Sequence, residues 1–216
     1  MRAQLRAGAA VYNAGEYHGA HDAWEDHWLD LAAGTDDERF LHGLIQFTAA
    51  LHHARQANWE GLSGLVAGAR EYLDGLPDDY RGVNLGAVRA YLDAMHADPE
   101  VVERVAPPPL THEGAAVGLD DLDFGEAAIA AAILAEEYDR YEEDLVERGV
   151  EYAREELSES GTGTFVALVM DFAADVEHRD LVYQRLEQHV ARRDAEREDV
   201  AGLFDVDADG GGGPSA

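Results

Sequence analysis

Apolar residues recur three and four positions apart through most of this chain, and the alternating pattern of a β-strand is nearly absent. Residues 40–51, FLHGLIQFTAAL, show the helical pattern most clearly. Side chains at this spacing share one face of a helix, where they can pack against a neighbouring helix. The sequence therefore predicts an all-α fold, a bundle of antiparallel helical hairpins with additional C-terminal helices.

Turn and cap residues set the ends of the predicted helices. Thr35 with Glu38, and Asp123 with Glu126, each form the pattern of a self-capping helix start. We expect helices over residues 2–14, 17–32, 36–56, 59–74 and 84–96, a long helical region over 123–160 and a last one over 164–200. A break in the long region is expected near Gly149, because glycine weakens a helix interior.

A proline-rich stretch, PPPL at residues 107–110, gives the strongest boundary signal in the chain, together with the acidic GLDDLD that follows it. We expect a helical domain over residues 1–110 and a C-terminal helical region over 120–204, to which no role is assigned. The glycine-rich end, residues 205–216, is expected to be a disordered tail.

The charge balance is strongly acidic. The chain has 45 Asp and Glu against 16 basic residues, and its net charge is −29. Nucleic-acid binding is not expected, since contacts with phosphates require clustered cations. Adaptation to concentrated salt explains the acidity better, because the screening length falls to about 3 Å at 1 M. We expect a halophilic protein of haloarchaeal type that needs molar salt to fold.

Composition also limits location and chemistry. No apolar run is long enough to span a membrane, and the start MRAQLRAGAAVYN lacks the apolar block of a signal peptide, so we expect a cytoplasmic protein without a membrane partner. The absence of cysteine and lysine excludes disulfides, thiolate nucleophiles and lysine-dependent chemistry. A small molecule or a protein partner, and the oligomeric state, are left open.

The segment HGAHDAWEDHW, residues 18–28, concentrates polar and aromatic side chains on one predicted helix. Four polar residues share a face because they lie three, four and seven positions apart: His18, His21, Asp22 and Glu25. Trp24 and Trp28 lie four apart on the flank of this face, where we expect them to pack in the core.

The helix over residues 36–56 is the expected partner of this segment, since the short GTD linker makes the two helices an antiparallel hairpin. Its polar stripe contains His42, Gln46 and His53. Residues level with each other in such a hairpin should have numbers that sum to about 67. This predicts Glu25 opposite His42 and His21 opposite Gln46. His53 would lie about 10 Å from His21 along the axis.

Two interpretations of this cluster are open. Imidazoles and carboxylates on facing helices can bind Zn, Mn or Fe, which makes His21, Glu25, His42 and His53 candidate metal ligands. Alternatively, Glu25 accepts a hydrogen bond from His42 while His21 is tied to Gln46, and the buried network needs no ligand.

Four stretches carry a family resemblance: YNAGEYHGAHDAWEDHW at 12–28, LHGLIQFTAALHH at 41–53, RQANWEGL just after it and LPDDYRGVN at 76–84. Together they resemble domain of unknown function 309 over about residues 5–95. The resemblance implies a small all-helical fold and no established activity. It places these residues at signature positions: His21, Glu25, Trp28, Gly43, Gln46, His53 and Asn58. His18 and Asp22 depart from the family pattern, so the resemblance does not extend to them.

These observations predict a non-catalytic helical protein that binds a small ligand or a partner. The expected ligand-binding residues form the polar cluster: His21, Glu25, Gln46, His53 and His42. The alternative is a metal-dependent, hydrolase-like enzyme that uses the same groups with a divalent metal as cofactor. Catalytic residues are not assigned, and a purely structural role is a third possibility.

Overall fold

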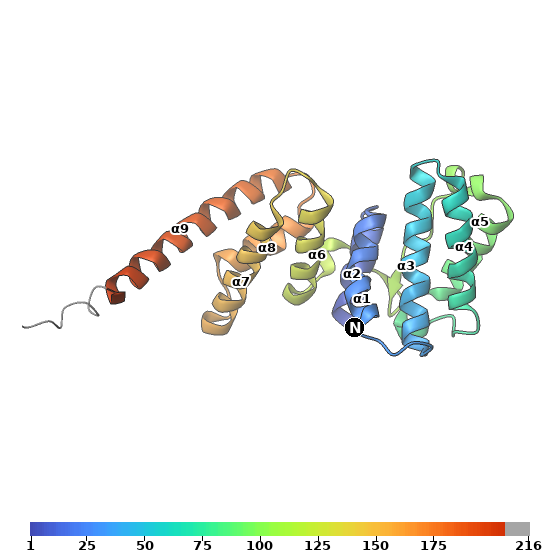
Figure 1. Cartoon of the computed structure of the whole chain (residues 1–216), viewed down its shortest axis with the longest axis horizontal. Coiled ribbons are helices and arrows are strands. Elements are labelled where there is room, and N and C mark those ends of the chain that lie inside the picture. The colour runs from blue at the N-terminus through green and yellow to red at the C-terminus, as the bar shows by residue number, and fades with distance from the viewer. Residues whose placement is uncertain (206–216) are drawn as a thin grey trace, which may run out of the picture. The chain divides into compact units, whose positions relative to one another are not determined.

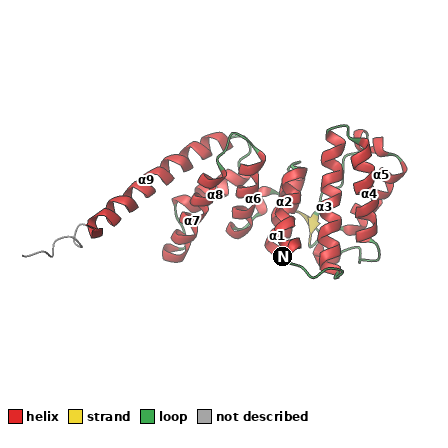
Figure 2. Cartoon of the chain, viewed as in Figure 1, coloured by secondary structure: helices red, strands yellow, loops and turns green. Residues whose placement is uncertain are grey.

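The computed structural model describes residues 1–205, so the predicted tail lies outside the described residues apart from its first position. The helices are α1 (Arg2–Asn13), α2 (Tyr17–Leu29), α3 (Asp36–Arg55), α4 (Trp59–Leu73), α5 (Leu85–Ala97), α6 (Phe124–Glu137), α7 (Glu143–Ser160), α8 (Thr164–Ala174) and α9 (Arg179–Asp205) (Figure 1). Two short strands, β1 (Thr111–His112) and β2 (Ala115–Ala116), pair antiparallel (Figure 2). The predicted all-α class is confirmed.

The chain divides into two compact units, Met1–Glu142 and the part from Glu143 onward. In the first unit, helices α1 to α5 pack side by side in chain order, so that each helix contacts the one that follows it (Figure 1). Helix α6 then returns to pack against α1 and α2. The unit boundary therefore follows α6, whereas the sequence pattern suggested a boundary before it, at the PPPL stretch.

Helix α6 joins the first unit because its side chains are small and one of its ion pairs is buried. Its sequence, FGEAAIAAAILAEE, lets the backbone approach α2 closely. A Cβ on Gly19 of α2 would lie only 2.8 Å from Ile133 Cγ2 of α6. Glu126 is 3% exposed and accepts from Arg6 Nε of α1 at 2.8 Å. This pair ties α6 to α1, and the PPPL boundary signal marks only a loop inside the unit.

The core of the first unit is aromatic and aliphatic. Trp24, Phe40 and Phe47 have no exposed surface. Trp24 packs on Gly8 of α1, where a Cβ would lie 2.2 Å from its Nε1 atom, and its indole N–H donates to the Gln4 carbonyl at 3.1 Å. The expectation that Trp24 lies in the core therefore holds.

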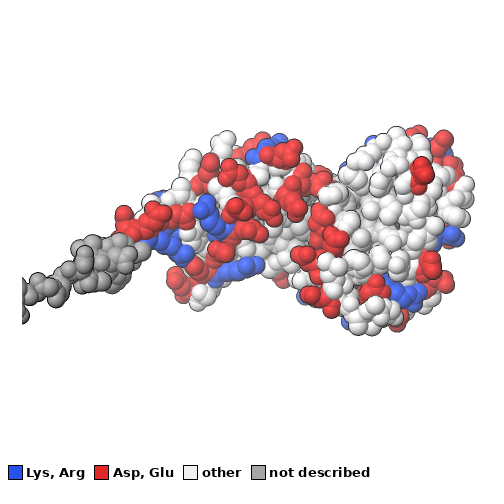
Figure 3. Space-filling model, viewed as in Figure 1, with Lys and Arg blue, Asp and Glu red and all other residues white. Residues whose placement is uncertain are grey.

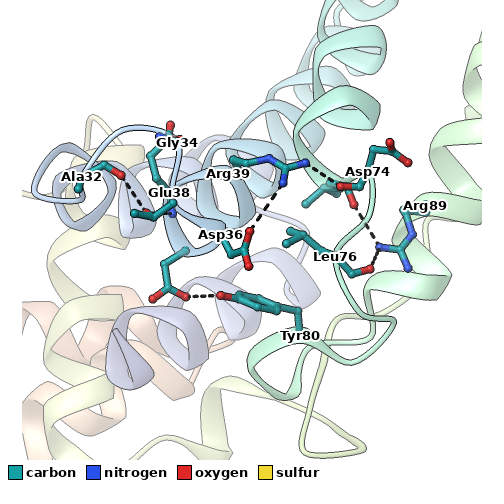
Figure 4. A network of polar contacts seen from close by, with 12 residues as sticks. Ala32, Gly34, Asp36, Glu38, Arg39, Asp74, Leu76, Tyr80 and Arg89 are labelled. Atoms are coloured by element: carbon teal, nitrogen blue, oxygen red, sulfur yellow. Dashed lines mark hydrogen bonds and ion pairs between the residues drawn. The ribbon is translucent and has the colours of Figure 1, made fainter.

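Polar contacts fix the turn between α2 and α3 against the connection between α4 and α5 (Figure 4). Thr35 caps α3 by accepting from the Glu38 amide at 3.3 Å, as its sequence pattern indicates. Arg39 donates to the Asp74 carbonyl at 2.7 Å, and Tyr80 Oη donates to Asp37 at 2.7 Å. These contacts join the beginning of α3 to the connection between α4 and α5, about forty residues further along the chain.

The second unit consists of α7, α8 and α9, which pack against one another. Gly149 lies inside an unbroken α7, so the expected break at this residue is wrong. Its lack of a side chain leaves room for α9, since a Cβ there would lie 2.8 Å from Leu186 Cδ1. The predicted helical region over residues 123–160 is instead interrupted between Glu137 and Glu143. The predicted region over residues 164–200 is interrupted between α8 and α9. Gly149 therefore serves close helix packing. None of the described helices has the length and apolar character needed to cross a membrane.

Candidate functional site

The polar face of α2 meets the C-terminal end of α6. His18 Nδ1 donates to Glu137 Oε2 at 3.0 Å and lies 3.4 Å from Asp22 Oδ2. The Glu137 side chain is 20% exposed and that of Asp22 26%, whereas His18 is 53% exposed. The two carboxylates are therefore half-buried beneath an imidazole that solvent can reach.

Asp22 also takes part in a second group on α2. His21 Nε2 lies 3.6 Å from Glu25 Oε2, one helical turn away. Each of two sets of three residues offers one ligand atom per residue, all within 4.8 Å of one another: His18, Asp22 and Glu137, and His21, Asp22 and Glu25. We call these five residues the α2/α6 cluster. Asp22 is the member that both sets share.

Local packing explains why Glu137 reaches α2. The missing side chain at Gly19 leaves room for α6, and a Cβ there would lie 3.7 Å from Glu137 Oε2. One residue further on, Tyr138 Oη donates to the Glu16 carboxylate at the start of α2. The end of α6 is thus held against the first turn of α2.

His52 of α3 lies beside the cluster, with its ring centroid 5.1 Å from that of His18. The Gln56 amide donates to its Nε2 atom at 2.7 Å. Burial lowers the pKa of His52, and the neighbouring His18 lowers it further. Burial and His18 therefore favour the neutral form of His52.

The carboxylates of the cluster oppose one another electrostatically. Burial is the main cause that raises the pKa of Asp22, and Glu137 and Glu25 add to it. His18 and His21 act in the opposite direction but do not cancel the effect. A cation placed among these groups would favour the ionised form of Asp22.

His42 lies elsewhere, in a stack of rings between α2 and α4. Its ring centroid is 4.4 Å from that of Trp28 and 3.9 Å from that of Tyr72. The Gln46 amide donates to His42 Nε2 at 3.1 Å. His42 Nδ1 is buried 3.4 Å from Glu38 Oε1, close enough for an ion pair but without a well-aligned hydrogen bond. Glu38, rather than Glu25, is the carboxylate beside His42.

Glu38 also accepts from Trp28 Nε1 at 2.9 Å and from the Gly34 amide at 3.1 Å. These donors, the indole first, hold its pKa below the usual value of 4.5 despite its burial. Glu38 therefore stays ionised and joins the ends of α2 and α3. Trp28 contributes a hydrogen bond here in addition to its packing.

Gln46 and His53 face α4. A Cβ on Gly68 would lie 2.0 Å from Gln46 Oε1, and a Cβ on Gly61 would lie 2.8 Å from His53 Nδ1. The Asn58 amide donates to His53 Nδ1 at 2.8 Å, and its Oδ1 atom caps α4 at the Gly61 amide. Close packing of α3 on α4 thus accounts for Gly61 and Gly68.

The five predicted ligand residues therefore do not come together in one cluster. Each contacts one other member of the set or a residue outside it. His21 lies beside Glu25, His42 beside Gln46, and His53 beside Asn58. The expected pairs across the hairpin, Glu25 with His42 and His21 with Gln46, do not form. One reason is that α3 turns its polar stripe toward α4, and another is that partners one turn apart on the same helix are nearer.

Glu137 and His52 are functional candidates that the sequence reasoning missed. The numbers of His18 and His52 sum to 70, close to the sum of about 67 expected for residues level with each other in the hairpin. The hairpin geometry alone could therefore have placed His52 beside His18. Glu137 stands after an alanine-rich stretch. Only the return of α6 onto α2 brings it to His18.

Comparison with known proteins identifies relatives of part of the chain. Residues 5–65 match the family described as Domain of unknown function (DUF309). An "Uncharacterized protein" of Aquifex aeolicus (strain VF5) is 30% identical over 97 residues, which cover 45% of this chain. The chain spans only 29% of that relative's length. The resemblance to DUF309 is confirmed for residues 5–65, and the haloarchaeal type stays a prediction.

Proposed function

We propose that this protein is a small-ligand-binding module whose ligand is a divalent transition-metal ion. The ion would be held by His18 and Asp22 of α2 and by Glu137 of α6. One observation carries the proposal: an imidazole and two carboxylates, from helices more than a hundred residues apart, offer ligand atoms within 4.8 Å of one another. Such donors on facing helices suit Zn, Mn or Fe.

The spacing of the donor atoms supports this proposal. Zinc binds imidazole nitrogen and carboxylate oxygen at about 2.0 to 2.1 Å, so the ligand atoms of a tetrahedral site lie about 3.4 Å apart. His18 Nδ1 lies 3.0 Å from Glu137 Oε2 and 3.4 Å from Asp22 Oδ2. Small side-chain movements would therefore bring the three groups around one ion.

The donor types also favour one class of ion. An imidazole nitrogen suits transition metals, whereas calcium and magnesium prefer sites made of oxygen atoms. The half-exposed His18 ring gives an ion a path from solvent. Gln46, His42 and His53 have no place in the proposed site, because their described contacts hold α3 to α4.

Calorimetric titration of the untagged protein with Zn²⁺ and Mn²⁺ tests the proposal. We expect binding that Glu137→Gln or Asp22→Asn weakens at least about tenfold, since even the loss of groups that support a ligand costs that much. Glu136→Gln is the matched control, because Glu136 is the exposed neighbour of Glu137 on the same helix. Absence of binding, or an equal loss in Glu136→Gln, would contradict the proposal.

A metal-dependent hydrolase is the second candidate. Three protein ligands leave one tetrahedral position for water, and the 53% exposure of His18 leaves this position open to a substrate. Hydrolysis of a panel of carboxylic and phosphoric esters should then require added Zn²⁺ or Mn²⁺ and be lost in Asp22→Asn. Metal binding without hydrolysis of any substrate in the panel favours the binding module.

A further inference from the structure

Asp22 stands between two histidine–carboxylate pairs of the α2/α6 cluster. On one side is His18 with Glu137, and on the other His21 with Glu25. The ligand atoms of each triad that includes Asp22 lie within 4.8 Å of one another. The two triads have no other member in common.

We propose that the α2/α6 cluster binds two divalent metal ions, with the Asp22 carboxylate bridging them. This inference rests on the proposed function and extends it from one ion to two. One oxygen of Asp22 would bind the ion held by His18 and Glu137. The other oxygen would bind the ion held by His21 and Glu25.

Distances within the cluster suit this arrangement. Bridged metal ions in two-metal sites lie about 3.5 to 4 Å apart. The ring centroids of His18 and His21 are 6.2 Å apart, so each imidazole can serve its own ion. The two rings come from adjacent turns of α2, and Asp22 lies one turn beyond His18 and next to His21.

Charge supports two ions as well. The cluster contains three carboxylates, Asp22, Glu25 and Glu137, within reach of two imidazoles. A single ion at His18 would leave Glu25 with its 3.6 Å contact to His21 alone. Two divalent ions would meet three carboxylates, which leaves one net positive charge to be balanced by a bound hydroxide or an anionic ligand.

The count of bound ions tests the inference. Equilibrium dialysis of the full chain against Mn²⁺, with metal analysis, should give two ions for the wild type and one for Glu25→Gln. Glu25 is 46% exposed, so this variant should keep its fold, which thermal unfolding verifies. Asp26→Asn is the matched control, because Asp26 is the exposed neighbour of Glu25. It should still bind two ions.

Electron paramagnetic resonance then tests the bridge. Two Mn²⁺ ions that share Asp22 should give an exchange-coupled spectrum, and Glu25→Gln should convert it to that of an isolated ion. Two uncoupled ions in the wild type would overturn the bridging role of Asp22. One ion that Glu137→Gln removes would overturn this inference but keep the proposed function, whereas no bound ion would overturn both.

Discussion

Glu38 shows how one buried carboxylate can organise the junction of two helices. It lies in the first turn of α3, where the helix dipole favours a negative charge. From there it accepts from Trp28 of α2 and from Gly34 of the connecting turn. With 13% of its side chain exposed, it depends on these donors to stay ionised.

Replacing this carboxylate tests its contribution. Glu38→Gln should lower the free energy of unfolding by about 1 to 2 kcal/mol at pH 7, because charge-assisted hydrogen bonds weaken. The folded pKa of Glu38 lies below 4.5, so its contribution is complete above about pH 5 and is lost as the pH falls through the folded pKa. Urea unfolding between pH 3.5 and 7 measures both effects.

Asp36→Asn provides the control for this experiment. Asp36 lies in the same helical turn, but its side chain is 66% exposed and its contact with Arg39 is 3.7 Å long. Its replacement should change the unfolding free energy by less than about 0.5 kcal/mol. A difference between wild type and Glu38→Gln that stays constant with pH would contradict the role given to the ionised carboxylate.

At the level of elements, glycine controls how closely α3 and α4 approach. A Cβ on Gly43 would lie 2.5 Å from both Cγ and Cδ2 of Leu73, which is fully buried. Gly64, by contrast, has no atom of the described residues within 4 Å of the place where a Cβ would stand. The two glycines occupy helix interiors alike and differ only in what they face.

Replacement of these two glycines by alanine should change the free energy of unfolding in opposite directions. Gly43→Ala should destabilise the protein by about 1 to 3 kcal/mol, because the branched end of Leu73 must move within a packed core. Gly64→Ala should stabilise it by up to about 1 kcal/mol, because alanine is the better helix former. Chemical unfolding of both variants measures these changes. A Gly43→Ala variant as stable as Gly64→Ala would show that α3 and α4 are not so closely packed.

At the scale of the whole molecule, charge is the dominant property. The net charge is −29, and red carboxylates are spread over the face seen in Figure 3, with fewer blue arginines among them. Several ion pairs are exposed, such as Arg70 with Asp93, and each contributes little to stability. Carboxylates outnumber arginines by 45 to 16, and their mutual repulsion opposes folding in dilute buffer.

We propose that stability depends on salt for this reason. The melting temperature should rise by more than about 10 °C between 0.1 M and 3 M KCl, since screening within about 3 Å removes most of the repulsion. Differential scanning calorimetry measures the change, with sucrose of equal osmolality as a control for effects that do not depend on charge. Equal melting temperatures at both KCl concentrations would contradict the halophilic prediction.

The sequence by itself determined the helical class, the start of α3 at Thr35 and the polar face of α2, because these features depend on residues within a few helical turns. It also indicated the core position of Trp24. Local spacing was enough for these predictions, although the residues that Trp24 contacts, Gln4 and Gly8, lie on another helix.

Only the tertiary structure decided what the polar face of α2 meets. The rotation of α3 directs Gln46 and His53 toward α4, and the return of α6 brings Glu137 to His18. Both depend on how one helix is rotated and packed against another, which helical periodicity does not encode. His18 and Asp22, outside the family pattern, thereby became the centre of the candidate site, because packing brought a second carboxylate to them.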